Sequence, residues 1–169
     1  TLLRRHQGLQ VGDSILVQQP VYYPFSEVIR DNDRVIVSND LILGDDNRYH
    51  IDLADFEKQI VEHDVKLFLL CNPHNPSGRA FTKEELTAMG DICVKHGVTV
   101  VSDEIHNDFV YPGSEHTVFA NVDPRFSEFT VTCTAPSKTF NLAGLQISNI
   151  FIPNENLRKA FKTEIDRTG

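Results

Sequence analysis

A single lysine, Lys138, stands between an apolar segment and a turn that contains Gly144. Residues 129–133 alternate in polarity and are rich in β-branched side chains, which predicts a buried strand that ends shortly before Lys138. Open α/β sheets bind ligands at this edge. A lysine that forms a Schiff base or transfers a proton needs burial or nearby cations to lower its pKa, and a cleft at a strand end can supply both. Taken alone, a lysine after a strand is more often an ordinary surface residue.

Two further groups of polar residues also follow predicted strands. Residues 66–71 form a continuous apolar run, as expected for a parallel strand buried on both faces, and the string Asn-Pro-His-Asn-Pro-Ser-Gly-Arg follows at 72–79. Two Asn-Pro pairs restrict the backbone of this loop, so its polar side chains are held rigidly. Residues 98–102 form the next apolar run and lead into Asp103 and His106. The sequence therefore predicts that both groups lie at the same edge of one sheet.

The acidic residues and histidines after residue 102 also permit an interpretation as metal ligands, which would be Asp103, Glu104, His106, Asp108 and His116. The sequence contains neither H-E-x-x-H nor paired-cysteine spacing, so we predict no metal site.

A Ser137–Lys138 nucleophile pair is also disfavoured. Adjacent residues of an extended chain point apart, and Ala135 stands where an S-x-x-K motif requires serine. Glycine-rich nucleotide loops are absent.

Two tyrosines, Tyr22 and Tyr23, follow the predicted strand 14–18. One of them could cover a flat ligand. Considered alone, however, the pair is expected to pack in the core.

The predicted elements alternate between strands and helices. The expected helices are 26–31, a helix capped by Asp52, a helix from a Thr82 capping box to about residue 95, and an amphipathic closing helix after residue 154. Residues 39–47 are polar and predict a surface connection. This order predicts an α/β fold with a mostly parallel sheet flanked by helices. The expected strands are 14–18, 34–38, 66–71, 98–102, 129–133 and 147–152.

Composition limits the classes of function. The 169 residues are 40% hydrophobic, which suits one globular domain with a sizeable core. The formal net charge of −8 disfavours nucleic acid and anionic membranes as partners. The cysteines are odd in number, lie in apolar runs and lack C-x-x-C spacing, which predicts a cytoplasmic protein. No apolar run approaches the length of a membrane span.

Both ends of the sequence suggest a longer protein. The first residues show no signal-peptide pattern and no initiator methionine, and they are typical of the end of a helix. The last residues directly follow another predicted helix. We therefore expect residues 1–169 to be part of a large domain that lacks an N-terminal segment and a C-terminal small domain.

Three motifs occur in order: Asn75-Pro76-Ser77-Gly78, then Asp103-Glu104-Ile105-His106, then Ser137-Lys138-Thr139-Phe140-Asn141. In identity and spacing they resemble the fold-type I pyridoxal-phosphate enzymes of the class I/II aminotransferase superfamily. Within that group the chain is most similar to cystathionine β-lyase and related carbon–sulfur lyases. The resemblance covers essentially the whole chain, and three motifs in register are far more specific than any one of them.

The resemblance implies a role for each site residue. Lys138 would hold pyridoxal 5'-phosphate as a Schiff base and then remove the α-proton of the substrate. Asp103 would pair with the pyridine nitrogen, and Asn75 would bond to the phenolic oxygen of the ring. Tyr22 matches the aromatic residue that stacks on the ring. His106 stands where many relatives have a tyrosine near the phenolic oxygen.

Two positions depart from the family pattern. Gln146 stands where many relatives have a phosphate-binding arginine, and Ala135 stands where a serine often helps. Phosphate binding would then depend on other groups, such as Ser137 or Thr134. The usual phosphate loop would lie before Thr1, and the arginine for the substrate carboxylate would lie after residue 169.

For the whole protein the resemblance implies β-elimination on a sulfur amino acid such as cystathionine, giving a thiol, pyruvate and ammonia. The alternative is an aminotransferase of the same fold. A second alternative is a noncatalytic binding or regulatory module, which the intact Lys138, Asp103 and Asn75 disfavour. The expected partners are a small amino-acid substrate and, at full length, a second copy in a homodimer. Residues 1–169 alone are expected to bind the cofactor weakly and to have little or no activity.

Overall fold

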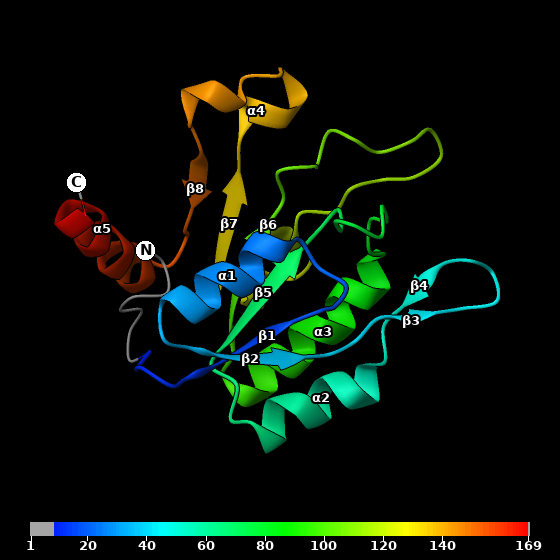
Figure 1. Cartoon of the computed structure of the whole chain (residues 1–169), viewed down its shortest axis with the longest axis horizontal. Helices are drawn as coiled ribbons and strands as arrows, with labels where there is room; N and C mark the ends of the chain where they lie inside the picture. The colour runs from blue at the N-terminus through cyan, green and yellow to red at the C-terminus, as the bar shows by residue number, and fades with distance from the viewer. Residues whose placement is uncertain (1–8, 169) are drawn as a thin grey trace.

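One mixed sheet forms the centre of the molecule. The computed structural model describes residues 9–168, so the helix end predicted at the N-terminus lies outside the described residues. The sheet order is β2-β1-β5-β6-β7-β8, and its strands are parallel except for the antiparallel pair β7–β8 (Figure 1). Strand bounds are β1 Ser14–Val17, β2 Val35–Ser38, β5 Leu67–Cys71, β6 Thr99–Asp103, β7 Thr130–Thr134 and β8 Asn149–Phe151. The predicted mostly parallel α/β fold is confirmed.

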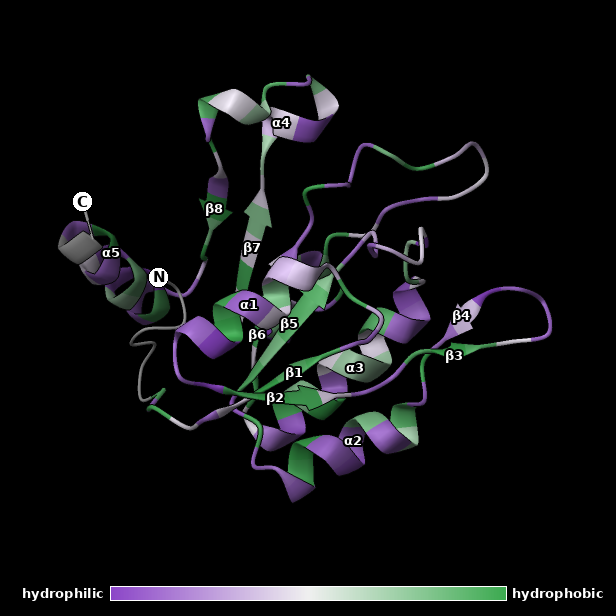
Figure 2. Cartoon of the chain, in the orientation of Figure 1, coloured by the Kyte–Doolittle hydropathy of each residue, from purple (hydrophilic) through white to green (hydrophobic). Residues whose placement is uncertain are grey.

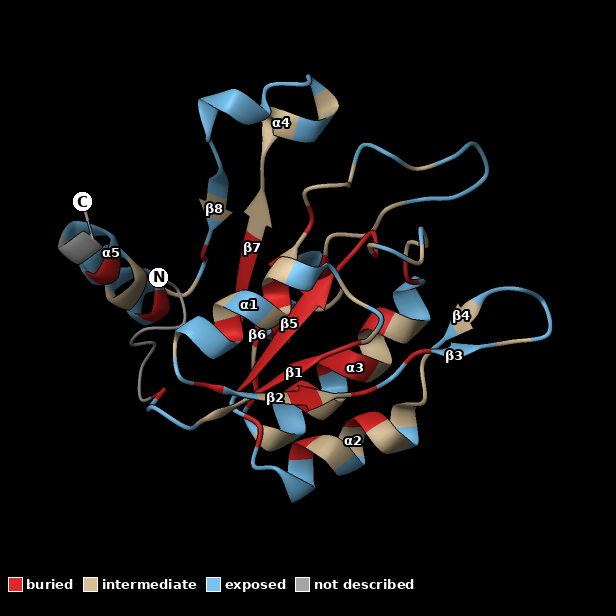
Figure 3. Ribbon diagram, in the orientation of Figure 1, coloured by how far each residue is buried: buried red, intermediate tan, exposed pale blue. Residues whose placement is uncertain are grey.

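Helices cover both faces of this sheet. Their bounds are α1 Tyr23–Asp31, α2 Leu53–Glu62, α3 Lys83–His96, the short α4 Pro136–Thr139 and α5 Glu155–Thr168. Alternate residues of β5 enter different cores: Phe68 packs with residues of α2 and α3, whereas Leu67 and Leu69 pack with residues of α1 and α5. Apolar side chains therefore fill both faces, and the central strands β1, β5 and β6 are mostly buried, whereas β8 at the edge is largely exposed (Figures 2 and 3).

The helices α2 and α3, which pack in the same core, begin where their sequences indicate. The Asp52 carboxylate accepts a hydrogen bond from the Asp55 amide at the start of α2, at 2.9 Å. Thr82 and Glu85 form a reciprocal capping box at the start of α3. Gly97 ends α3 in the left-handed conformation, with φ of 67°. Both predicted caps are confirmed.

The register of the three central strands aligns their carboxyl ends. Asp103 on β6 lies opposite Cys71 on β5 and opposite Cys133 on β7. Two backbone hydrogen bonds continue this alignment past the strands, from the Asn72 amide to the Asp103 carbonyl and from the Glu104 amide to the Cys133 carbonyl. The loops that follow these strands therefore start side by side.

Several short elements were not predicted. Residues 39–47, expected as a connection, contain β3 Ile42–Leu43, which pairs with β4 Tyr49–His50 in a two-stranded hairpin. Irregular residues before β7 form the turns η1 Phe119–Asn121 and η2 Pro124–Glu128, and η3 Ala143–Leu145 follows α4. Such elements are too short to show a hydrophobic period. None of the helices in the described range is long and apolar enough to cross a membrane.

Candidate active site

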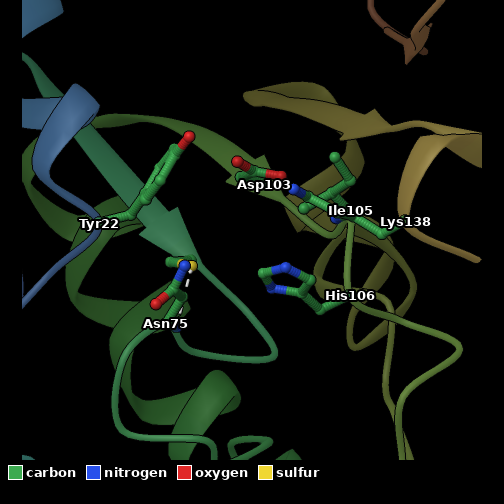
Figure 4. Close-up of a pocket in the computed structure, with 7 residues that line it drawn as sticks. Tyr22, Asn75, Asp103, Ile105, His106 and Lys138 are labelled. Carbon is green, nitrogen blue, oxygen red and sulfur yellow. Dashed lines mark hydrogen bonds between the residues drawn. The ribbon is translucent and has the colours of Figure 1, made fainter. Parts of the chain in front are cut away.

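A pocket opens at the carboxyl edge of the sheet. The empty space within it is about 380 Å³, part of which is open solvent. Figure 4 shows Tyr22 and Asn75 on one side, His106 and Lys138 on the other, and Asp103 between them. The lining residues are Tyr22, Cys71, Asn75, Asp103, Ile105, His106 and Lys138.

Four parallel strands supply these residues. Tyr22 follows β1 and directly precedes α1, Asn75 lies in the loop after β5, and Asp103 is the last residue of β6. Lys138 is the third residue of α4, which follows β7. The sequence therefore correctly places five predicted residues at one sheet edge, because parallel strands end at the same edge.

Backbone contacts fix Asn75 relative to its neighbours. The Tyr22 amide donates a hydrogen bond to the Asn75 carbonyl at 3.0 Å. The Asn75 amide in turn donates to the Cys71 sulfur at 3.4 Å, which is the contact dashed in Figure 4. The first bond joins the segment after β1 to the loop after β5, and the second holds that loop against the last residue of β5.

Asp103 is a half-buried carboxylate. Burial raises its pKa above the ordinary value, and the nearby Glu104 charge acts in the same direction. The amide of Ile105, which donates to Asp103 Oδ1 at 3.1 Å, and the ring of His106 act in the opposite direction. A cation placed against Asp103 would relieve the cost of its burial.

The neighbouring Glu104 faces the protein interior and is buried. Its carboxylate accepts hydrogen bonds from Ser102 Oγ at 2.8 Å, the Phe119 amide at 3.1 Å and His116 Nε2 at 2.9 Å. Glu104 and His116 are thereby paired with each other rather than directed into the pocket. Within residues 9–168 no group of three or more His, Cys, Asp or Glu side chains is placed to hold a metal ion.

Lys138 is exposed and lines the pocket from α4. The helix is joined to the loop after β6 by a hydrogen bond from Thr139 Oγ1 to Asp108 Oδ2, at 2.6 Å. Ser137, the preceding residue, is half-buried and is not among the lining residues. The pocket therefore brings Tyr22, Asn75, Asp103, His106 and Lys138 together but does not include Ser137.

The expectation that both tyrosines pack in the core is wrong. Tyr22 is 41% exposed and Tyr23 is 68% exposed. They start α1 at the edge of the sheet, where Phe25, one turn further on, is the residue that enters the core. The Tyr22 ring contacts the Phe25 ring edge-on, and the two ring centroids are 6.1 Å apart. The centroid of the Tyr23 ring lies 5.6 Å from that of Tyr22. These contacts leave Tyr22 on the pocket wall.

Two lining residues were missed by sequence reasoning. Cys71 ends β5 and Ile105 lies between Asp103 and His106, so their place next to motif residues was the available signal. Burial raises the pKa of the Cys71 thiol to about 12, and that of Cys133 also to about 12. All three cysteines are free thiols.

Several kinds of functional group face this pocket. An amine, a carboxylate, an amide, an imidazole and a phenol ring surround the same space. An amine can attack a carbonyl group or take up a proton, and the carboxylate can pair with a ring cation.

Comparison with known proteins gives a consistent result. The model of the family described as aminotransferase class I and II matches residues 3–166. Cystathionine β-lyase PatB of Bacillus subtilis (strain 168) is 49% identical over 158 residues, which are 94% of this chain and 41% of that protein.

Two solved structures have the same fold. Cystalysin of Treponema denticola, which contains a pyridoxal 5'-phosphate cofactor, matches this chain with a TM-score of 0.91 and 43% sequence identity. The match covers 94% of this chain and 40% of the cystalysin chain. The PLP-bound C–S lyase of Staphylococcus hominis has a TM-score of 0.87 and 37% identity, covering 92% of this chain and 40% of its own. The chain thus spans about two fifths of the length of the relatives it matches.

Proposed function

Since this chain belongs to the class I and II aminotransferase family, we propose that the whole protein is a pyridoxal-phosphate-dependent carbon–sulfur lyase. Its reaction is β-elimination on cystathionine or a related sulfur amino acid, and its products are a thiol, pyruvate and ammonia. The convergence of Lys138, Asp103 and Asn75 in one pocket carries this proposal. The lyase names of the relatives described above favour elimination over other reactions of the family.

The pocket residues fit pyridoxal phosphate. The amine of Lys138 is the group that condenses with its aldehyde, and the half-buried carboxylate of Asp103 suits its cationic ring nitrogen. The Asn75 amide and the His106 ring are suited to its phenolic oxygen, and the Tyr22 ring to its face. Ser137 is proposed to contribute to phosphate binding from its place beside Lys138.

The residues of this chain act on the substrate in a defined order. When bound, pyridoxal phosphate supplies an electron sink for negative charge at the α-carbon. Once the amino group of the substrate has displaced it, the free amine of Lys138 would take the α-proton, and Asp103 would keep the ring nitrogen protonated. The sulfur of the substrate would leave as a thiolate, and water would hydrolyse the released enamine to pyruvate and ammonia. Tyr22 and Asn75 keep the ring in one orientation throughout.

The organisation of the whole protein is part of the proposal. Residues 1–169 form part of the cofactor-binding large domain, and the whole protein is a homodimer. Support comes from the share of the relatives' length that is matched and from apolar side chains exposed around η3, including Leu145 and Ile147. A cytoplasmic location is supported by the three free cysteines.

Absorption spectroscopy tests the cofactor and its lysine. Full-length protein incubated with pyridoxal phosphate is expected to show the visible band of the lysine-bound cofactor, and Lys138→Ala is expected to lack it. Lys66→Ala, which changes an exposed lysine paired with Asp64, is the control and should keep the band. Absence of the band from the unmutated protein would leave a noncatalytic module as the better interpretation.

The reaction type is tested separately. With cystathionine and no added keto acid, a lyase releases pyruvate over many turnovers. An aminotransferase, the alternative that the family also contains, stops after one turnover until an acceptor is supplied. Consumption of cystathionine that depends on an added keto acid and yields the keto acid of cystathionine, without release of pyruvate, would therefore favour the aminotransferase.

A further inference from the structure

The histidine of the Asn-Pro-His-Asn-Pro string, His74, has no role in the reaction described above. His74 directly precedes Asn75 in the loop after β5, and it is only 2% exposed. A buried polar ring in a loop needs hydrogen-bond partners, because an unpaired buried group is costly. The partners of His74 show what it connects.

Both ring nitrogens of His74 are engaged. Nε2 lies 3.2 Å from the Gln18 carbonyl oxygen, and Nδ1 lies 2.8 Å from Ser77 Oγ. Since a carbonyl can only accept, Nε2 carries the proton, and the neutral ring therefore accepts from the Ser77 hydroxyl. The ring also packs edge-on against Phe81, with centroids 5.8 Å apart. Burial lowers the pKa of His74, which favours this neutral form.

These contacts join two segments that carry pocket residues. Gln18 directly follows β1 and stands four positions before Tyr22, whereas Ser77 belongs to the same loop as Asn75. The backbone of His74 closes this loop, since its amide donates to the Arg79 carbonyl and its carbonyl accepts from the Gly78 amide. At the pocket the same two segments meet again, through the hydrogen bond from the Tyr22 amide to the Asn75 carbonyl.

We propose that His74 is a positioning residue that cross-links the segment after β1 to the loop after β5 and so fixes Tyr22 and Asn75 on one side of the pocket. The inference deepens the proposed function and rests on it for the identity of the ligand. The cross-link itself is a property of this chain, so it can be measured without the cofactor.

The variants separate the two hydrogen bonds of the ring. His74→Gln keeps an N–H donor that can reach the Gln18 carbonyl, and His74→Ala removes both bonds and the contact with Phe81. The matched control is His96→Gln, which changes a half-buried histidine at the end of α3 that bonds to Glu57 at 2.7 Å. That position lies at the opposite edge of the sheet from the pocket, because α3 runs from the loop after β5 back to the start of β6.

Hydrogen–deuterium exchange of full-length, cofactor-free protein gives the first measurement. In His74→Ala, peptides covering residues 18–23 and 72–79 are expected to exchange about tenfold faster, because a buried hydrogen-bonded anchor is lost. His74→Gln should show a smaller change in the same two peptides, and His96→Gln should show none there. Unchanged exchange, or faster exchange in only one of the two segments, would overturn the cross-link.

The second measurement follows the cofactor. Asn75 is proposed to bond the phenolic oxygen, so displacing Asn75 should shift the pH midpoint of the visible band by about 0.5–1 unit. His74→Ala is expected to cause this shift in the unmutated background and no additional shift in Asn75→Ala. Faster exchange with an unchanged midpoint would reduce His74 to a structural role and overturn its positioning role. A protein with no visible band would refute the proposed cofactor, and exchange would still decide the cross-link.

Discussion

At the scale of single residues, Asp103 combines two opposing requirements. Its carboxylate must be ionised to pair with a cationic ring, yet burial raises its pKa and so opposes that charge in the cofactor-free protein. The hydrogen bond from the Ile105 amide offsets only part of this effect. Cofactor binding therefore favours a charged side chain at position 103, whereas the stability of the cofactor-free protein favours an uncharged one.

Asp103→Asn is expected to stabilise the cofactor-free protein at pH 7. A carboxyl group whose folded pKa is raised costs stability above that pKa, and the cost disappears as the pH falls below the ordinary value of 3.8. The asparagine oxygen can still accept from Ile105. Thermal unfolding between pH 3 and pH 7 should show an advantage of the variant that grows with pH.

The substitution Asp103→Asn should also weaken the binding of pyridoxal phosphate. Loss of a charge-assisted hydrogen bond is expected to reduce cofactor affinity by about 10- to 100-fold. The control is Asp45→Asn on the exposed hairpin, which should change neither property. A variant that is less stable than the unmutated protein at pH 7 without cofactor would contradict the role given to burial.

Sequence reasoning located the polar groups that line the pocket more completely than their surroundings. The positions of Lys138, Asp103 and Asn75 could be predicted because each lies at or just after the end of a strand that an apolar run or an alternating pattern marks. The exposure of Tyr22 and Tyr23 could not, because a pair of aromatic residues carries no periodic signal that separates a core from a pocket wall. The place of Cys71 in the wall depends on the register between β5 and β6, which the sequence does not specify.

At the scale of elements, α3 depends on close packing at one glycine. Gly90 lies in the buried face of this helix, and a Cβ atom at this position would lie inside van der Waals contact with the ring of Phe126. That ring is fully buried and stacked on Phe119, with centroids 5.1 Å apart. The ring therefore has little room to move away.

Gly90→Ala is expected to lower the free energy of unfolding by about 1–3 kcal/mol through overpacking. This cost opposes the gain of about 1 kcal/mol that alanine gives inside an ordinary helix. Urea unfolding of residues 1–169, in which Gly144 is exposed, measures the difference. Gly144→Ala, which would meet no atom within 4 Å, is the control, and equal stability of both variants would refute this account.

The long elements were predictable and the short ones were not. The helices α2 and α3 combine an apolar face with a cap, so sequence defines both the helix and its first residue. The strands β3 and β4 form a local hairpin, but with two residues each they are too short to show a periodic pattern. The four-residue α4 is held by a contact between residues far apart in sequence, the bond from Thr139 to Asp108, which a local pattern does not reveal.

At the scale of the molecule, one arm differs from the rest of the surface. It consists of η3 and the residues on either side of it up to β8, and nearly all of it is exposed (Figure 3). Its apolar members include Phe140, Leu145 and Ile147. Clustered exposed apolar side chains are typical of surfaces that are covered in the functional assembly.

The double variant Leu145→Ser with Ile147→Ser tests this arm. These side chains are 61% and 52% exposed, so in residues 1–169 alone the change should lower the binding of a hydrophobic dye and leave stability nearly unchanged. In the full-length protein the same change should destabilise by about 2 kcal/mol or more, because the side chains are expected to be buried there. Val61→Ser, at an exposed apolar site on α2, is the control. Equal effects in both proteins would show that the arm stays uncovered.

The alignment of Cys71, Asp103 and Cys133 on neighbouring strands determines which group can attack an aldehyde at this site. Thiolates compete with amines for aldehydes, and both thiols lie on the strands beside Asp103. With pKa values of about 12, only about one thiol in 10⁵ is ionised at pH 7. Maleimide should therefore label them far more slowly than a cysteine introduced at the exposed Ser114, and rapid labelling of either would contradict this. Burial of Cys71 and Cys133 thus favours the amine of Lys138 over these two thiols as the group that attacks an aldehyde at this site.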